Sequence, residues 1–200
     1  MPILSFLQLQ PSDFAPKYNF DYTADYLPES QNRGGLPYYL PIGWYRHALR
    51  IDKKYQDTSA WLGSINAHGE WPVAFHGTRS TAVRNIADHG LLTGKIVRDA
   101  MLTEAISQKG EEVNLPGLYV ATHCNGGSHP LYTENFNIDV PPNDIESFAV
   151  VFQCRVRPDS YTTHTAPVCT GEAWRIVDPT AIRPYGILLK NSSIKVPYQS

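Results

Sequence analysis

The chain has 200 residues, enough for one domain that buries a core without disulfide bonds or structural metal. Its formal charge of −2 and its lack of a basic cluster do not favour a nucleic-acid-binding protein. No apolar run is long enough to span a membrane, and the N-terminus lacks the basic and apolar regions of a signal peptide. We therefore expect a monomeric intracellular protein, cytoplasmic or nuclear, with no membrane partner.

The three cysteines, Cys124, Cys154 and Cys169, are odd in number and lack CxxC spacing, so they predict neither a disulfide framework nor a zinc site. His123, Cys124 and His129 fall in one polar loop. They lack a fourth ligand at a known spacing, and surface loops often carry such residues. We therefore expect no metal.

The first 70 residues are rich in Pro, Asp, Ser, Asn and aromatic residues and show no sustained periodicity. They are interpreted as an N-terminal extension, residues 1–70, that packs on or wraps a domain formed by residues 71–200. A partly disordered arm is the alternative. Within the extension, residues 45–55 are compatible with a strand or a short helix, and a strand up to Ile51 is favoured. A short helix is expected to begin at Ser59 and to end before His68-Gly69.

Residues 71–91 predict a strand, a polar turn and a helix. The apolar run from Pro72 to Phe75 is typical of a buried strand, and His76-Gly77-Thr78 then interrupts the pattern. In the following helix, Thr81 is the expected N-cap and Gly90 the expected C-cap. This layout often binds a ligand, although a single His at a strand end is more commonly a structural polar residue.

The remaining elements favour an α+β fold dominated by antiparallel sheet. The strongest strand is Phe148–Val156, expected in the centre of a sheet, and Pro184 indicates an edge or an irregular start for the last strand. The other expected elements are helical segments at 99–106 and 131–136 and strands at 117–121, 174–177 and 182–190.

Three separated motifs resemble the catalytic domain of the poly(ADP-ribose) polymerase or diphtheria-toxin-like ADP-ribosyltransferases. They are His76-Gly77-Thr78-Arg79 with Ile86 and Gly90-Leu91, then Gly117-Leu118-Tyr119, and finally Glu172-Ala-Trp-Arg-Ile-Val-Asp178. Their order and rough distances agree with the family over residues 71 to about 190. The first 70 residues do not match the helical domain that precedes the catalytic domain in the polymerases. The resemblance implies split antiparallel sheets with short helices and long loops, and a cleft that holds NAD as a substrate.

The resemblance also implies roles for individual residues. His76 would donate a hydrogen bond to a hydroxyl of the adenosine ribose, and the backbone of Gly77 would hold the nicotinamide carboxamide. Thr78 would add ribose contacts. Tyr119 would lie against the nicotinamide ring, with Tyr132 as the nearest residue for its other face.

Glu172 departs from the family pattern. The family places four residues between its catalytic Glu and the following Asp, whereas five separate Glu172 from Asp178. Because side chains alternate along a strand, this shift would turn Glu172 away from the cleft and put Ala173 there. A bulge or a looser turn at Gly171 would restore the geometry. Both arrangements remain open at the level of sequence.

The function implied by the resemblance is NAD-dependent mono-ADP-ribosyl transfer to a protein or nucleic-acid acceptor, with release of nicotinamide. Glu172, His76 and Tyr119 would be its catalytic residues. The alternative is an inactive module of the same fold that binds NAD or a partner. An RNA 2′-phosphotransferase would need a basic set that Arg79, Arg84 and Arg155 do not obviously form. An ordinary α+β domain with a chance His-Gly-Thr is the remaining interpretation.

Overall fold

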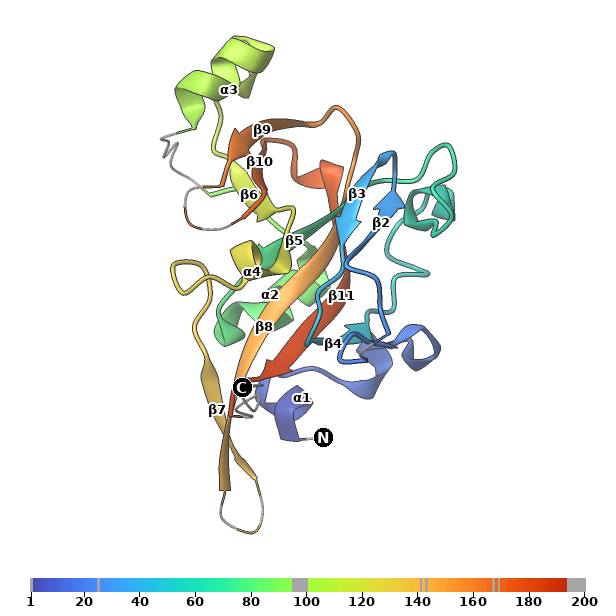
Figure 1. Ribbon diagram of the computed structural model, residues 1–200, viewed down its shortest axis with the longest axis vertical. Helices are drawn as coiled ribbons and strands as arrows, with labels where there is room; N and C mark the ends of the chain where they lie inside the picture. Colours follow the sequence, from blue (N-terminus) through green and yellow to red (C-terminus); the bar gives the residue numbers. More distant parts are fainter. Residues whose placement is uncertain are drawn as a thin grey trace.

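The protein is a mixed α+β structure that consists mostly of antiparallel sheet with a few short helices (Figure 1). The computed structural model describes residues 2–24, 26–94, 101–140, 142, 144–166, 168 and 170–193. Its strands are β1 Phe20–Asp21, β2 Ser30–Arg33, β3 Leu36–Tyr39, β4 Tyr45–Ala48, β5 Val73–Gly77, β6 Leu118–Ala121, β7 Phe136–Val140, β8 Asp144–Val156, β9 Tyr161–Thr165, β10 Glu172–Ile176 and β11 Ile182–Asn191. Its α-helices are α1 Pro2–Phe6, α2 Val83–His89, α3 Leu102–Lys109 and α4 Cys124–Gly127.

Within the described residues, nine strands form one antiparallel sheet and β2 and β3 form a separate hairpin. The order across the main sheet is β1-β4-β11-β8-β5-β6-β10-β9, and β7 pairs with the first part of β8. Strands that follow one another in the chain are therefore often separated in the sheet. The order brings β5, β6 and β10, which come from three distant parts of the sequence, next to one another.

The long strands β8 and β11 form the middle of the sheet and cross the molecule diagonally (Figure 1). The predicted central place of residues 148–156 is confirmed, because β8 pairs with β11 on one side and β5 on the other. The register between β8 and β11 shifts between Pro184 and Gly186. This irregularity accommodates a proline, which cannot donate to a ladder, inside a strand with two neighbours. The prediction of an edge or an irregular start is confirmed by this shift, and β4 pairs with β11 only from Gly186 to Leu189.

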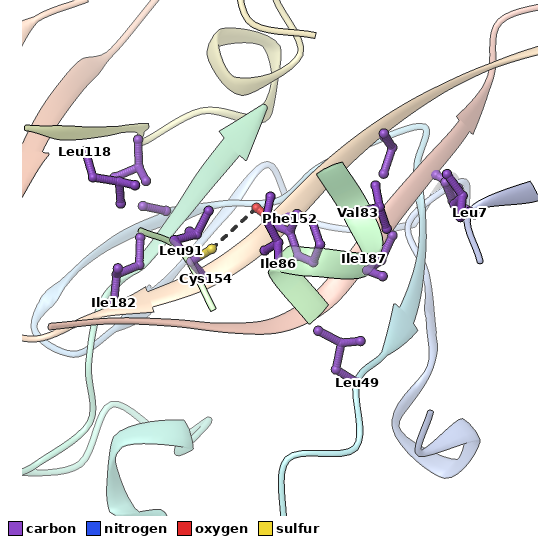
Figure 2. Close-up of a cluster of buried hydrophobic side chains, with 14 of the residues drawn as sticks. Leu7, Leu49, Val83, Ile86, Leu91, Leu118, Phe152, Cys154, Ile182 and Ile187 are labelled. Carbon is purple, nitrogen blue, oxygen red and sulfur yellow. Dashed lines mark hydrogen bonds between the residues drawn. The ribbon is translucent and has the colours of Figure 1, made fainter. Parts of the chain in front are cut away.

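One face of the sheet, here called the helix face, carries the larger hydrophobic core (Figure 2). Val83 and Ile86 of α2 pack there against Phe152 and Ile187 of the two long strands. Burial of such side chains stabilises the fold by roughly 1.5–3 kcal/mol each. Helix α2 thus fixes the chain that follows β5 to the same face of the sheet.

The opposite face, here called the N-terminal face, is covered by the segment that precedes β5. Tyr22, Tyr38 and Trp44 pack there against Phe75 and Val151. Strands β1 and β4 of this segment also extend the main sheet beyond β11. The segment up to residue 70 therefore contributes both strands and core residues to the sheet.

Several local predictions differ from the structure. Thr81 does not cap α2: it lies in a 3-10 turn, Ser80–Ala82, and Ala82 occupies the N-cap without a side-chain bond. Gly90 does end the helix, with φ of +80° and its N–H donating to the Ile86 carbonyl. The predicted helical turn at 131–136 is wrong, because Phe136 begins β7 and a short helix, α4, precedes it.

The predicted helix at 99–106 is observed as α3, Leu102–Lys109, and residues 99 and 100 of the prediction lie outside the described residues. Cys169 also lies outside them. The strand expected at 45–51 is shorter, ending at Ala48. Among the described helices, none combines the length and hydropathy needed to cross a membrane.

Candidate functional site

The three motifs meet where β5, β6 and β10 run side by side. Strand β6 pairs with β10 over four residues, but β5 and β6 share one residue pair, Phe75 with Ala121. Beyond that pair the two strands separate. There the His76 ring bridges them, because its Nδ1 lies 2.9 Å from the carbonyl oxygen of Tyr119. The first two motifs are thus joined at a split in the sheet.

The bond to Tyr119 fixes the tautomer of His76. A carbonyl oxygen only accepts hydrogen bonds, so Nδ1 carries the proton and donates it. Desolvation by the surrounding protein lowers the pKa of His76, and the bond to Tyr119 opposes this in part. The imidazole is therefore neutral at pH 7, and its Nε2 accepts. In this tautomer, Nε2 would accept a hydrogen bond from a ribose hydroxyl, whereas the expected role has His76 as the donor.

This lowered pKa predicts a pH dependence of stability. When the pKa is lower in the folded than in the unfolded protein, the unfolded chain binds more protons between the two values, and stability rises with pH there. We expect the free energy of unfolding to fall as the pH drops from about 7 toward 5, starting near the unfolded pKa of about 6.5. Urea unfolding at several pH values should show a shallower loss in His76→Gln.

Desolvation also lowers the pKa of His47 and His123, so these two residues add to the same slope in the wild type and in the variant. Replacement of the exposed His68 by Gln is the matched control. An unchanged slope in His76→Gln would contradict the neutral, desolvated state of His76.

Gly77 packs so closely on helix α4 that only glycine fits. A Cβ at this position would lie 1.8 Å from the carbonyl oxygen of Gly127 in α4 and 3.1 Å from the Cβ of Tyr132. Tyr132 is 45% exposed, so its side chain stands at the surface beside the end of β5. The structure therefore brings two of the expected NAD-binding residues, Gly77 and Tyr132, into contact range.

Thr78 is buried, and its backbone is held by a residue that the sequence did not single out. The Thr133 hydroxyl lies 2.6 Å from the Thr78 carbonyl oxygen, to which it donates, and 3.3 Å from that of Val150. Thr133 thereby ties the segment after α4 to β5 and β8. The Thr78 hydroxyl itself lies 3.5 Å from the Arg79 carbonyl oxygen, a long hydrogen bond.

Tyr119 is anchored by Arg175. These residues lie opposite each other on β6 and β10, and the Arg175 Nε lies 3.2 Å from the Tyr119 hydroxyl. The guanidinium is fully buried and also donates to the carbonyl oxygens of Val113 and Leu115, at 2.8 and 2.6 Å. It therefore fixes both the ring and the loop before β6. The sequence contains no local motif that indicates this role of Arg175.

The side chains of Glu172 and Tyr119 leave the sheet on opposite faces. Ala121 pairs with both Phe75 and Ala173, so Ala173, and Tyr119 two positions along β6, share the N-terminal face. Glu172 alternates to the helix face, where its carboxylate lies 3.2 Å from the indole Nε1 of Trp174. Strand β10 pairs regularly from Glu172 onward, although Gly171 before it has φ of +99°. The geometry matches the arrangement in which Ala173 replaces a carboxylate beside Tyr119.

His76 leaves β5 on the same face as Glu172. It alternates with Phe75 and shares its face with Ala74, which packs in the same core as Trp174. The side chains of His76, Tyr119 and Glu172 therefore do not leave the sheet on one face. The His76 ring and the Tyr119 backbone are brought together, whereas the Tyr119 ring points to the other side.

The N-terminal hairpin also contacts this region through its aromatic rings. Tyr39 of β3 stacks on His123 just after β6, with ring centroids 3.8 Å apart. His123 also lies against Gly171, where a Cβ would be 2.1 Å from its Nδ1. Residues of the first 70 thus touch the ends of β6 and β10.

The basic residues considered for phosphate chemistry are paired with different carboxylates. Arg79 pairs with Glu134, Arg84 with Asp13 and Asp88, and the buried Arg155 with Glu70. They do not form one cluster. Within the described part of the chain, no group of three or more His, Cys, Asp or Glu side chains is arranged to hold a metal ion.

Comparison with known protein families gives no match: no family model fits this chain.

Proposed function

We propose that this chain is an NAD-binding domain of the ADP-ribosyltransferase type. NAD would bind at the split between β5 and β6, with its nicotinamide end beside Gly77. The observation that carries the proposal is the adjacency of the three motif strands, together with the His76 bond across the split. Motifs that are far apart in the sequence therefore lie on the neighbouring strands β5, β6 and β10.

Each residue at the split has a property that suits its role toward NAD. The neutral His76 offers Nε2 as an acceptor for a ribose hydroxyl. Gly77 is fixed by its close packing on α4, and its backbone N–H and C=O would hold the nicotinamide carboxamide. Tyr119 has its hydroxyl held by Arg175, and such a fixed ring would orient a planar nicotinamide with little loss of side-chain entropy.

Cleavage of the bond between nicotinamide and ribose develops positive charge on the ribose, and a nearby carboxylate would stabilise it. On the face that carries Tyr119, the corresponding strand position is Ala173. We therefore propose that the domain binds NAD but releases nicotinamide slowly. In this form it acts as a binding module.

The second candidate is a mono-ADP-ribosyltransferase that uses Glu172 to modify a protein or nucleic-acid acceptor. It is favoured by the placement of Glu172 on the face that also carries His76. Its cleft would open toward the helix face. The two candidates share the NAD site and differ in whether removal of Glu172 changes the rate of nicotinamide release.

The proposal is tested by titration of NAD into the purified protein in a calorimeter. We expect His76→Ala to raise the Kd for NAD at least about tenfold, corresponding to about 1.4 kcal/mol, because it removes the acceptor at the split. His68→Ala, which changes an exposed histidine outside the site, should bind like the wild type. A folded wild-type protein that binds no NAD at millimolar concentration would contradict the proposal.

A further inference from the structure

A cavity bordered by described residues lies away from the β5–β6 split. It has a volume of about 950 Å³ and lies on the N-terminal face, between the sheet and the segment that covers it. Buried side chains line its floor, namely Tyr22, Tyr38, Arg155 and Tyr185, and exposed ones such as Tyr18 form its rim. His76, Gly77 and Tyr119 are not among its lining residues. Its size is at the upper end of that of small-molecule sites, roughly 300–1,000 Å³.

The lining is positively charged although the whole chain has a formal charge of −2. Its cations are Lys17, Arg33, Arg46, Arg50 and Arg155, and its carboxylates are Asp52 and Asp57. Asp57 is already bound by Arg183, with oxygen–nitrogen distances of 2.7 and 2.9 Å. The buried Glu70 pairs with Arg155 at 3.4 Å and with Arg33 at 3.8 Å. Lys17, Arg46 and Arg50 remain in excess over Asp52, which favours an anionic ligand.

Arg46 is a partly buried cation of the cavity lining. Its Nη atoms lie 3.2 Å from the Tyr22 hydroxyl, 3.2 Å from Oε1 of Gln153 and 2.9 Å from the Tyr18 carbonyl oxygen, all neutral acceptors. No ion pair to Arg46 occurs within the described ranges of the chain. Its Nε is buried and lacks a hydrogen-bond partner, and the same holds for Nε of Arg155. A partly buried guanidinium that has only neutral hydrogen-bond partners favours an anionic ligand in the cavity beside it.

The rings of the cavity suit a planar ligand. The Arg46 guanidinium lies 5.8 Å from the Tyr22 centroid and 5.5 Å from that of Tyr185. At the rim, Tyr18 and Phe20 are 59% and 40% exposed, which leaves aromatic surface free for stacking. On the inner side, Tyr38 packs with Phe75 at 6.4 Å between centroids. These two rings lie between the cavity and the end of β5.

We propose that this cavity is a second binding site, which takes an aromatic anion of the size of a nucleoside monophosphate. The anionic group would lie at Arg46, and the aromatic ring would lie against Tyr18 and Phe20. The site is distinct from the NAD site at the split and does not depend on it.

The experiment is calorimetric titration with AMP, with adenosine and inorganic phosphate as separate probes. We expect AMP to bind more tightly than either probe alone, because only AMP uses both the charge and the rings. Arg46→Gln should raise the Kd for AMP at least about tenfold. Because Arg46 is a partly buried residue, Tyr18→Ala provides a second variant at the exposed rim, and it leaves the backbone carbonyl that Arg46 uses. It should weaken AMP binding while the thermal unfolding temperature is retained.

Because AMP is one half of NAD, the cavity is also titrated in His76→Ala, which removes the acceptor at the split; AMP should still bind this variant and should bind it more weakly when Tyr18→Ala is added. AMP binding that is lost in His76→Ala and kept in Tyr18→Ala would place AMP at the split and overturn the proposal. Adenosine that binds as tightly as AMP would overturn its anionic part. An absence of AMP binding to the folded wild type at millimolar concentration would overturn it as a whole.

Discussion

Gly77→Ala is expected to destabilise the protein by about 3 kcal/mol or more. The added methyl group would lie 1.8 Å from the Gly127 carbonyl oxygen, and backbone atoms cannot yield as a flexible side chain does. Either β5 or α4 must shift, and both carry residues of the split. For a chain of this length, the loss corresponds to a decrease in Tm of about 6–12 °C, measurable by calorimetry or circular dichroism.

Gly94→Ala is the matched control for this substitution. A Cβ at Gly94 would meet no atom of the described residues within 4 Å, and the φ of Gly94 lies outside the left-handed region. We expect its Tm to stay within about 2 °C of that of the wild type. Equal effects of the two substitutions would contradict the close contact between β5 and α4.

Ala173→Glu is expected to increase the rate of nicotinamide release from NAD at least about tenfold. It places a carboxylate on the face that carries Tyr119, at the position indicated by the pairing with Ala121. Groups that stabilise developing charge at such sites are worth roughly 10²–10³ in rate, so a tenfold gain allows for imperfect placement. Release of nicotinamide can be followed by chromatography on samples with equal amounts of folded protein.

Ala173→Gln provides the control, since it has nearly the same shape as the glutamate variant but no charge. It should release nicotinamide no faster than the wild type. The second candidate would be supported if the wild-type protein already releases nicotinamide quickly and Glu172→Gln loses this activity. In that case Glu172 is the catalytic carboxylate, and Ala173 is not at the relevant position.

The elements that the sequence predicted are those with strong local signals. Strand β8 has an almost continuous apolar run, and β5 and β6 have short apolar runs next to glycine. Gly90 at the end of α2 has the positive φ that helix C-termini favour. These features depend on neighbouring residues, so they can be recognised without knowledge of the tertiary structure.

The missed elements depend on contacts between distant residues. Strand β9 has the polar sequence YTTHT, yet His164 is buried because it bonds Thr162 and Glu104, each at 2.8 Å. The β2–β3 hairpin is similarly polar along β2 and rests on the N-terminal face through Tyr38. Neither network can be inferred from local periodicity.

The candidate site shows the same division. The sequence identified His76 and Gly77. Because side chains alternate along a strand, it left two arrangements open for Glu172. The choice between them depends on the register of β10 against β6, which pairs Ala173 with Ala121. Arg175 and Thr133, which hold Tyr119 and Thr78, have no local motif, so only their hydrogen bonds reveal them.

The central claim, that NAD binds at the β5–β6 split, is tested most directly by NMR with ¹⁵N-labelled protein. Titration with NAD should shift the backbone amide signals of Gly77, Thr78, Tyr119 and Tyr132, with smaller changes elsewhere. If saturating NAD leaves these four signals unchanged, or shifts only residues that line the cavity on the N-terminal face, the claim is contradicted.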